Sequence, residues 1–449
     1  TPGHEDFSED TYRTLMAADS AVMVIDASKG VEKQTIKLFK VCVLRHIPIF
    51  TFINKMDRQS KDPFELLDNI ESILGISTCP MNWPIGSGKE FKGVYDRGTK
   101  EVNMFTAEMN GQKEVNTWNV PIDDPTIDDQ IGDYFREKLE EDMELLEGAG
   151  SEFDLDEVRA GNLTPVFFGS ALTNFGVETF LQHFLKMTES PASRESNLRV
   201  IEPEEEDFSA FVFKIQANMN KAHRDRIAFI RIVSGEFDAG MEAWHVQSNK
   251  KVKLSQPTQI MASERQIVDK AYAGDIIGIF DPGTFAIGDT LCSSKDKFAF
   301  EGIPTFPPEH FARVKQLDTM KRKQFVKGIT QIAQEGAVQI FQEYITGMEE
   351  IIVGAVGTLQ FDVLKFRLAS EYNVDIGLEQ LPYEYIRYIS NQDEFDPDSI
   401  NGTSDMKKIR DLKGNVLLLF VHEWSIRMVQ ERNKGLELSE FGTGCLKRE

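Results

Sequence analysis

The sequence of 449 residues has few cysteines and no long apolar run. Its four cysteines (Cys42, Cys79, Cys292 and Cys445) lie far apart and form no CxxC pair, so we expect reduced thiols rather than a disulfide framework or a structural zinc site. No stretch approaches the roughly 20 apolar residues of a membrane-spanning helix, and nothing near Thr1 resembles a signal peptide. We therefore expect a cytoplasmic protein without a membrane partner, and the sequence offers no candidate metal ligands.

Positive charge is also scarce. The chain carries 50 Lys and Arg against 73 Asp and Glu side chains, a formal net charge of −23. Residues 1–206 hold most of the excess, with 20 basic and 39 acidic side chains. A chain this acidic cannot coat nucleic acid by bulk electrostatics, so we expect no DNA partner and only local contacts with RNA. The candidate contacts, which are also explained by a solvated basic face, are Lys221, Arg224, Arg226 and Arg231, and then Lys315, Lys321, Arg322, Lys323 and Lys327.

Length and patterning predict several domains. At about 100–200 residues per domain the chain is too long for one, and 41% apolar residues supply ample core. The first 190 residues alternate short apolar runs with helical patterns, as in an α/β domain with a parallel sheet. We expect buried strands at Ala21–Ala27, Pro48–Ile53 and Pro165–Phe168, helices at Val31–Arg45, Ile131–Gly148 and Val177–Lys186, and an insertion over Gly75–Asp129.

The pattern changes after a polar stretch, Ser190–Asp207, which we interpret as a linker. Short apolar strands separated by Gly, Asp and Asn turns then predict a small β-barrel. Further on, helices at Met320–Glu335 and Gly357–Glu371 flank a strand at Ile351–Val356, which indicates an α+β module. The predicted organisation is an α/β domain over 1–195, a linker over 196–207, a barrel over 208–300 and an α+β domain over 301–449.

One motif stands directly after the second predicted strand. Asn54-Lys55-Met56-Asp57 lies where the carboxyl end of a parallel strand faces the ligand crevice of an open α/β sheet. The Asp57 carboxylate can accept two parallel hydrogen bonds from the N1–H and 2-amino groups of guanine, whereas adenine would leave it unpaired at a cost of roughly 1–3 kcal/mol. The Asn54 amide can tie neighbouring loops to the base, and the Lys55 stem can lie over the purine face. The motif therefore predicts a guanine-selective pocket, although taken alone it is also a common solvated turn.

Two further segments fit the same kind of site. Ser170, Ala171 and Leu172 close the third predicted strand with a turn whose N–H groups can donate to guanine O6. Gly3 and His4 precede a helix-like stretch. A glycine there lets its N–H approach a γ-phosphate, and a neighbouring histidine can position the attacking water. Neither segment is specific alone, so the prediction depends on their combination with the motif after the second strand.

One segment that looks like a phosphate loop is rejected. Gly86-Ser87-Gly88-Lys89 is followed by Glu90 where Ser or Thr is required, and Trp83 stands where the earlier glycine of GxxxxGK[ST] belongs. No GxGxxG follows a predicted strand either, which argues against a dinucleotide-binding dehydrogenase.

Together these segments resemble translational GTPases, most closely the family of bacterial peptide chain release factor 3. The opening residues TPGHEDFSEDTYR look like the switch II segment of that family, and HEDFSEDTYR distinguishes it from elongation factor G. PIFTFINKMDR, FKIQANMNKAHRDRIAFIRIVSG and GTLQFDVLKFRLASEYNV are similar to the family's first, second and third domains. The likeness extends to about residue 390, and the tail beyond it is more divergent.

The resemblance implies a fold, a reaction and a set of partners. The fold is a P-loop-type G domain, a β-barrel like domain 2 of elongation factor Tu, and an α+β third domain. The function is a ribosome-dependent GTPase of translation termination that promotes dissociation and recycling of class I release factors. GTP or GDP and Mg²⁺ are the implied cofactors. The implied partners are the ribosome, through ribosomal RNA and stalk proteins, and the class I release factors.

The resemblance also assigns roles to single residues. The barrel segment around His223–Arg231 would face ribosomal RNA or the small subunit. The family's phosphate loop and Mg²⁺ ligands would lie upstream of Thr1, so we expect the chain as given to hydrolyse GTP poorly or not at all. The matched site residues are Gly3 for the γ-phosphate, His4 for orienting water, Asn54, Lys55 and Asp57 for the base, and Ser170, Ala171 and Leu172 for the second base loop.

Two alternatives remain open on sequence alone. A catalytically inactive ribosome-binding fragment would differ from an active GTPase in lacking an upstream GxxxxGK[ST] motif. Elongation factor G and ribosome-protection GTPases carry further domains after the third, and the 59 residues that follow position 390 are too few for two more domains.

Overall fold

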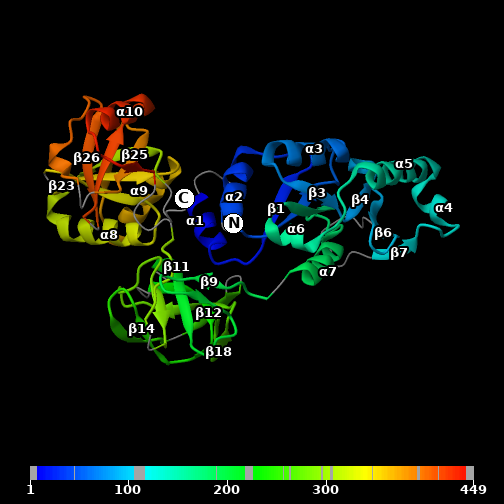
Figure 1. Cartoon of the computed structure of the whole chain (residues 1–449), viewed down its shortest axis with the longest axis horizontal. Coiled ribbons are helices and arrows are strands. Elements are labelled where there is room, and N and C mark those ends of the chain that lie inside the picture. The colour runs from blue at the N-terminus through cyan, green and yellow to red at the C-terminus, as the bar shows by residue number, and fades with distance from the viewer. Residues whose placement is uncertain are drawn as a thin grey trace. The chain divides into compact units, whose positions relative to one another are not determined.

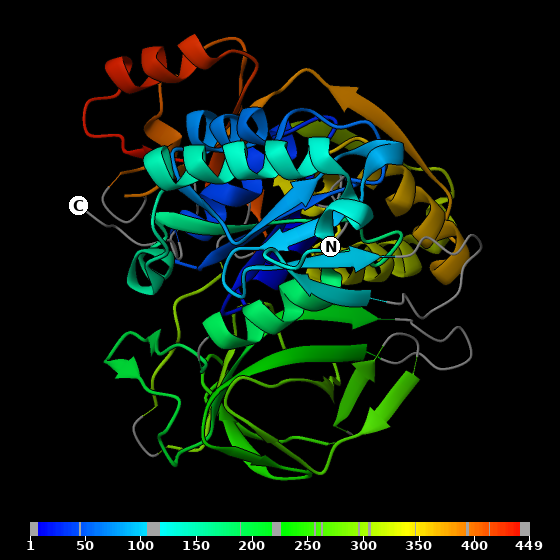
Figure 2. The same cartoon turned by 90° about the vertical axis from the view of Figure 1, so that its right-hand side faces the viewer.

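The computed structural model describes residues 8–44, 46–105, 117–188, 190–217, 226–255, 257–261, 264–294, 297–303, 307–345, 347–391, 395–412 and 414–440. The chain divides into two compact units, one formed by Ala18–Ser190 and the other by Thr1–Ala17 together with Pro191–Glu449. Figures 1 and 2 trace the helices and strands of both units.

The unit over residues 18–190 is built on a parallel sheet, as the alternation of apolar runs and helical patterns predicts. Its strand order is β1–β2–β8–β3, with β1 (Ala21–Asp26), β2 (Ile49–Asn54), β8 (Leu163–Phe168) and β3 (Ser77–Pro80). Strands β2 and β8 are buried along nearly their whole length, which is why they read as continuous apolar runs. The accompanying helices are α2 (Lys33–Leu44), α3 (Pro63–Leu74), α6 (Leu155–Ala160) and α7 (Val177–Met187) (Figure 1).

The insertion begins later than the sequence predicts. Strand β3 lies inside the predicted insertion, yet it pairs in parallel with β8 and therefore belongs to the central sheet. Its four residues, Ser-Thr-Cys-Pro, are too few and too polar to stand out as a buried strand. After β3 the chain forms a separate antiparallel sheet of β4 (Asn82–Ile85), β5 (Gly93–Asp96), β6 (Glu101–Phe105) and β7 (Thr117–Pro121), then α4 (Ile127–Ile131) and α5 (Asp133–Ala149).

The second unit contains a curled antiparallel sheet, visible in green in Figure 2. Short β9 (Arg194–Glu195) and β10 (Val200–Ile201) interrupt the stretch predicted as a linker. The curled sheet has the order β15–β14–β20–β11–β12–β19–β16–β17, and its interior is filled by aliphatic and phenylalanine side chains. Its strands are β11 (Ser209–Ala217), β12 (Arg226–Ser234), β14 (Glu242–His245), β15 (Lys250–Lys253), β16 (Thr258–Met261), β17 (Glu264–Ile267), β19 (Ile276–Phe280) and β20 (Thr290–Cys292), beside the pair β13 (Glu236–Asp238) and β18 (Lys270–Tyr272).

The α+β part of this unit is one eight-stranded antiparallel sheet with helices. The order is β24–β21–β23–β22–β26–β27–β25–β28, so the segment after residue 390 continues the sheet through the pairing of β26 with β22. Helices α8 and α9 share an apolar core with the sheet. The elements are β21 (His310–Gln316), α8 (Arg322–Gln334), β22 (Gln339–Glu343), β23 (Gly347–Ala355), α9 (Leu359–Tyr372), β24 (Ile376–Leu381), β25 (Tyr385–Ile389), β26 (Met406–Asp411), β27 (Val416–Phe420), α10 (Glu423–Arg432) and β28 (Leu438–Ser439).

Helix α1 (Ser8–Leu15) belongs to the same unit as the barrel and the α+β part.

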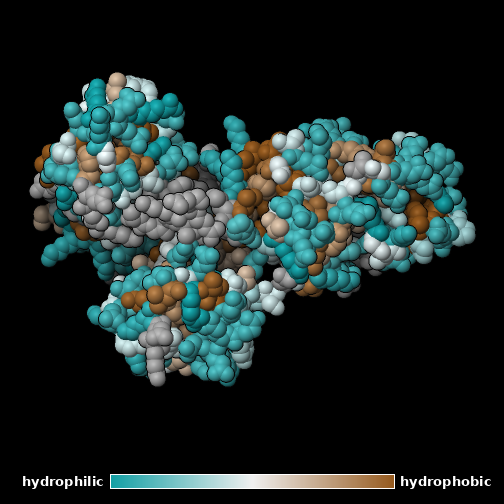
Figure 3. All heavy atoms as spheres, in the orientation of Figure 1, coloured by the Kyte–Doolittle hydropathy of each residue, from teal (hydrophilic) through white to brown (hydrophobic). Residues whose placement is uncertain are grey.

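The thiols of Cys42, Cys79 and Cys292 are free and buried, and burial raises the pKa of the Cys42 thiol to about 11. Hydrophilic residues occupy most of the face shown in Figure 3, between smaller apolar areas. Within the described ranges, no helix is both long and apolar enough to span a bilayer.

Candidate functional site

Two loops that follow neighbouring parallel strands meet at one edge of the central sheet. Strand β2 ends at Asn54 and β8 ends at Phe168, and Phe168 is the register partner of Ile53. Two backbone hydrogen bonds join the loops, since Gly169 N donates to Ile53 O at 3.0 Å and Met56 N donates to Gly169 O at 3.1 Å. The carboxyl ends of parallel strands are where open α/β sheets bind ligands. The structure thus brings together two segments that lie more than a hundred residues apart in sequence.

Side chains tie the two loops together. Asn54 Oδ1 accepts hydrogen bonds from the N–H groups of Lys55 and Ala171, both at 2.8 Å. Ser170 Oγ donates to Asp57 Oδ1 at 2.5 Å. Within the described part of the chain, Asp57 Oδ2 accepts no hydrogen bond. The Asp57 carboxylate is therefore oriented through one oxygen while the other is open to a donor.

Lys55 is fixed by a residue that the sequence reasoning missed. Its backbone has φ 71°, in the left-handed region, and its Nζ lies 2.6 Å from Asp26 Oδ2. Asp26 ends β1 as the register partner of Asn54, and it also accepts hydrogen bonds from the N–H and hydroxyl of Ser28. Burial opposes ionisation of Asp26, but the hydrogen bonds from Lys55 and Ser28 outweigh it and lower the pKa of this carboxyl below its ordinary value. The sequence did carry a signal for Asp26, namely an acidic residue at the carboxyl end of the first predicted strand.

Buried contacts hold the end of β8 in place. Asn82 of β4 is 1% exposed, and its side-chain amide donates to Phe168 O at 3.1 Å and accepts from Phe168 N at 2.7 Å. A Cβ at Gly169 would lie 2.3 Å from Phe175 O, so only glycine fits this close approach. From the rejected phosphate-loop segment, Gly88 N donates to Met56 O at 2.9 Å. This segment therefore supports the loop after β2 through a backbone hydrogen bond.

The three amides predicted to face guanine O6 differ in availability. Ser170 N donates to Phe175 O and Ala171 N donates to Asn54 Oδ1. Leu172 is 76% exposed, and among the described residues its N–H has no hydrogen-bond acceptor. Leu172 N–H is thus ready to donate, whereas Ala171 N–H would first have to leave Asn54.

Gly3 and His4 lie outside the described residues. So do Lys221, His223 and Arg224 of the basic barrel segment.

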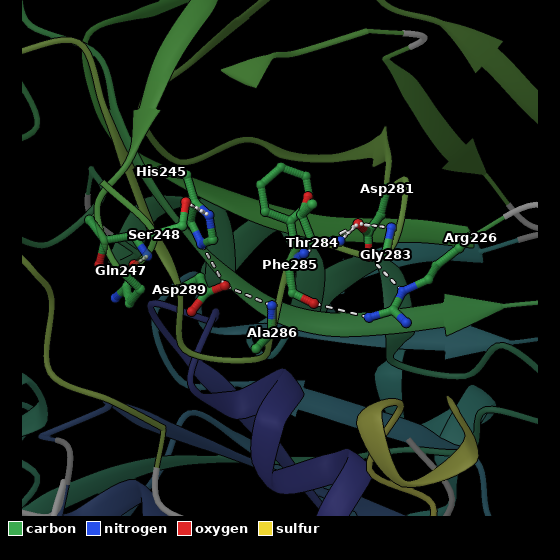
Figure 4. A network of polar contacts seen from close by, with 11 residues as sticks. Arg226, His245, Gln247, Ser248, Asp281, Gly283, Thr284, Phe285, Ala286 and Asp289 are labelled. Carbon is green, nitrogen blue, oxygen red and sulfur yellow. Dashed lines mark hydrogen bonds and ion pairs between the residues drawn. The ribbon is translucent and has the colours of Figure 1, made fainter. Parts of the chain in front are cut away.

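The prediction that the whole barrel segment faces RNA is wrong for its two arginines within the described residues. Arg226 and Arg231 are each 7% exposed. Arg226 is held inside the barrel by Asp281, with Nε 2.6 Å from Oδ2, and its Nη2 donates to Phe285 O at 3.0 Å (Figure 4). The alternation of apolar and basic residues in β12 did not reveal that Arg226 pairs with a buried carboxylate and a backbone carbonyl. In the second cluster, Lys323 and Lys327 are exposed on α8.

Comparison with known proteins decides the family. Residues 1–190 match the model of the elongation factor Tu GTP binding domain, residues 207–294 that of elongation factor G domain 2, and residues 300–430 that of the class II release factor RF3 C-terminal domain. A Symbiobacterium thermophilum protein named peptide chain release factor 3 is 56% identical over 436 residues, which cover 97% of this chain and 82% of that protein. The chain belongs to the peptide chain release factor 3 family. The Gloeobacter violaceus protein of the same name is 50% identical, with 98% of this chain and 83% of that one covered.

Membership in the release factor 3 family confirms the predicted fold class and the predicted reaction class. This family member is a translation-termination GTPase that binds guanine nucleotide and works on the ribosome. A crystal structure of a Thermus thermophilus protein superposes with a TM-score of 0.64 at 19% identity, covering 92% of this chain and 60% of that one. That likeness shows the multidomain fold alone.

Proposed function

We propose that the loops Asn54–Asp57 and Ser170–Leu172 form the pocket that reads the guanine base in this termination GTPase. The observation that carries the proposal is the direct bonding of the two loops, Asp57 to Ser170 and Asn54 to Ala171. These contacts hold a carboxylate and a row of amides at the same edge of the sheet.

Each residue of the pocket has a distinct task. Asp57 accepts hydrogen bonds from guanine N1–H and the 2-amino group, with Ser170 keeping the carboxylate in orientation. Leu172 N–H donates to O6, a position where adenine carries an amino group instead of an acceptor. Lys55 lays its aliphatic stem along the purine while its ammonium stays on Asp26. Guanine satisfies all of these groups, whereas adenine leaves the Asp57 carboxylate without these two donors.

Gly3 and His4 are the residues that we propose act in GTP hydrolysis. Gly3 N–H donates to the γ-phosphate, and His4 orients the attacking water once the ribosome is engaged. Mg²⁺, when bound, neutralises charge on the phosphates. Within the described residues, no group of three or more His, Cys, Asp or Glu side chains is placed to hold a metal ion. We propose that Mg²⁺ is held by the phosphate loop and switch I that the family relation implies.

We infer that the GTP cycle serves removal of class I release factors after peptide release. The family relation supports this, because the relatives over nearly the whole chain are named peptide chain release factor 3. Work on the ribosome also agrees with the cytoplasmic location expected from the sequence. The exposed lysines of α8 are the proposed contact with ribosomal RNA, in place of the buried barrel arginines.

Substitution of Asp57 tests the base-reading pocket. In the full-length protein, Asp57→Asn should weaken GTP binding about 10- to 100-fold, because an amide presents a donor to a guanine donor. The same variant should gain affinity for xanthosine triphosphate, whose 2-oxo group accepts that donor. Both affinities are measured by equilibrium titration with fluorescent nucleotides.

Asp68→Asn is the matched control, since Asp68 is exposed on α3 and loses the same charge. It should bind both nucleotides like the parent. Equal GTP affinity in the parent and in Asp57→Asn would refute Asp57 as the base reader.

A further inference from the structure

The carboxyl end of α8 is a meeting point of three elements in the second unit. The last turn of a helix carries carbonyl groups without intrahelical partners and the negative end of the helix dipole, so it attracts cations. Helix α8 ends at Gln334, and Gly336 follows in the left-handed region with φ +79°. Arginines from α1, β12 and α9 all reach this turn.

Arg13 of α1 occupies the end of α8 directly. Its Nη1 donates to Glu335 O at 3.2 Å and its Nη2 donates to Gly336 O at 3.4 Å. The side chain is 7% exposed, so a charged group is buried against these two carbonyls. A Cβ on Gly336 would lie 1.7 Å from Arg13 Nη1. The absence of a side chain at position 336 is therefore what makes room for the guanidinium.

Arg226 of the barrel contacts the same end of α8. Two of its nitrogens are fixed inside the barrel by Asp281 and the Phe285 carbonyl, as Figure 4 shows. The remaining one, Nη1, donates to Gln334 Oε1 of α8 at 2.7 Å. From the other side, Arg367 of α9 holds the Glu335 carboxylate at 3.1 and 3.2 Å. The turn that receives Arg13 is thus fixed by the barrel and by α9.

The end of α1 is anchored in the barrel as well. Met16 O accepts a hydrogen bond from Arg194 Nη1 at 3.2 Å, and the Arg194 guanidinium stacks over Phe211 at 3.7 Å from the ring centroid. Ala17 is 3% exposed and belongs to the apolar cluster around Phe211. Residues 8–17 therefore contact the barrel at one end and α8 through Arg13.

We propose that Arg13 is a positioning residue for GTP hydrolysis, seated in a socket formed by Glu335 and Gly336. Gly3 and His4 stand only a few positions before α1, so fixing α1 on α8 and the barrel fixes the base of the segment that carries them. The link to hydrolysis rests on the roles given above to Gly3 and His4, whereas the docking of α1 does not. The socket lets the barrel and third domain control how that segment meets the γ-phosphate.

Substitutions on both sides of the socket test the proposal in the full-length protein. Arg13→Ala removes the guanidinium, and Gly336→Ala displaces it with a methyl group. Each should speed hydrogen exchange of the residue 8–17 amides about tenfold or more. Each should also lower ribosome-stimulated kcat about tenfold while GDP affinity and KM for GTP stay near parental. Arg13→Lys keeps the charge and should restore part of the turnover.

Two variants control for charge and for backbone strain. Arg432→Ala removes another guanidinium–carbonyl contact of the third domain, and Gly435→Ala places a side chain at φ +93° with no atom nearby. Both should behave like the parent. Parental exchange of residues 8–17 in Arg13→Ala and Gly336→Ala would overturn the socket, and faster exchange with parental kcat would overturn the positioning role. Failure of the underlying function has a separate signature, namely that His4→Ala leaves ribosome-stimulated turnover unchanged.

Discussion

At the scale of single residues, the proposed pocket depends on charges that orient one another. Asp26 ends β1, Lys55 follows β2, and their contact at 2.6 Å spans two adjacent strands. Lys55 adopts a left-handed backbone, which costs a non-glycine residue roughly 1–2 kcal/mol. The ion pair and the Asn54 hydrogen bond to Lys55 N offset part of that cost. These contacts therefore fix the conformation of the loop that we propose reads the base.

Asp26→Asn should lower stability in a pH-dependent way. The folded-state pKa of Asp26 lies below its ordinary value of 3.8, so its carboxylate contributes stability that is fully present above about pH 4. This contribution is lost as the pH falls toward the lower folded-state pKa. The variant should be less stable than the parent by about 1 kcal/mol or less at pH 6, with the gap narrowing below pH 4. Urea unfolding at pH 6, 4 and 2.5 measures it, and a gap that widens in acid would contradict the assignment.

The sequence predicted the position of side chains that follow a buried strand, but not the position of a charge that is itself buried. Asn54 and Asp57 lie at the carboxyl end of a strand, as expected, because that strand is a continuous apolar run. Their role in reading a base stays a prediction. Asp26 was missed because it is the last residue of an apolar strand, and we interpreted it only as the point where the strand ends. Arg226 was mistaken for a surface charge, since only the folded barrel reveals the Asp281 carboxylate that pairs with it.

At the scale of elements, the small antiparallel sheet supports the edge of the central sheet where the loops after β2 and β8 meet. Strand β4 contributes Asn82, whose side chain hydrogen-bonds both the N–H and the C=O of Phe168 at the end of β8. The insertion is thus part of the scaffold that positions Ser170 and Ala171.

Asn82→Ala should lower the free energy of unfolding by about 2 kcal/mol, because it leaves the N–H and C=O of Phe168 buried without partners. GTP affinity should fall with it, since the loop after β8 loses its anchor. Urea unfolding and nucleotide titration measure the two effects. Asn119→Ala, on an exposed face of the same sheet, should change neither. Parental stability in Asn82→Ala would show that the β8 end needs no such support.

The elements predicted best are those whose apolar residues follow one regular spacing, either as a continuous buried run or as one face of a helix. Strands β1, β2 and β8 and helices α2 and α7 match the predicted segments within a few residues. Strand β3 was missed because four polar-rich residues carry no apolar run, although pairing with β8 makes them a strand. Pairing between distant segments also sets the sheet after residue 390, where β26 (Met-Lys-Lys-Ile-Arg-Asp) has little apolar character of its own.

At the scale of the whole molecule, an acidic chain must meet RNA through a local basic surface. The net charge of −23 repels phosphate at long range. Within the described residues, the exposed candidates lie on α8, with Lys315 nearby already paired to Glu379 at 2.8 Å. The same helix receives Arg13 at its other end, so the proposed RNA contact and the proposed socket share one helix.

Charge reversal of Lys323 and Lys327 to Glu should weaken ribosome binding and flatten its salt dependence. For each contact with a phosphate that the substitutions remove, the slope of log affinity against log salt should fall by about one. Binding to ribosomes at several salt concentrations measures the slope. Lys365→Glu with Lys434→Glu, two exposed lysines of the same domain, supplies the matched charge change. An unchanged slope in the α8 variant would make these lysines ordinary surface.

The most direct test of the guanine pocket is a crystal structure of the full-length protein with GDP. We predict that both oxygens of the Asp57 carboxylate lie about 3 Å from guanine N1 and the 2-amino nitrogen, and that Leu172 N–H points at O6. A guanine ring bound away from Asp57, or an Asp57 carboxylate turned from the base toward other protein groups, would contradict the central claim.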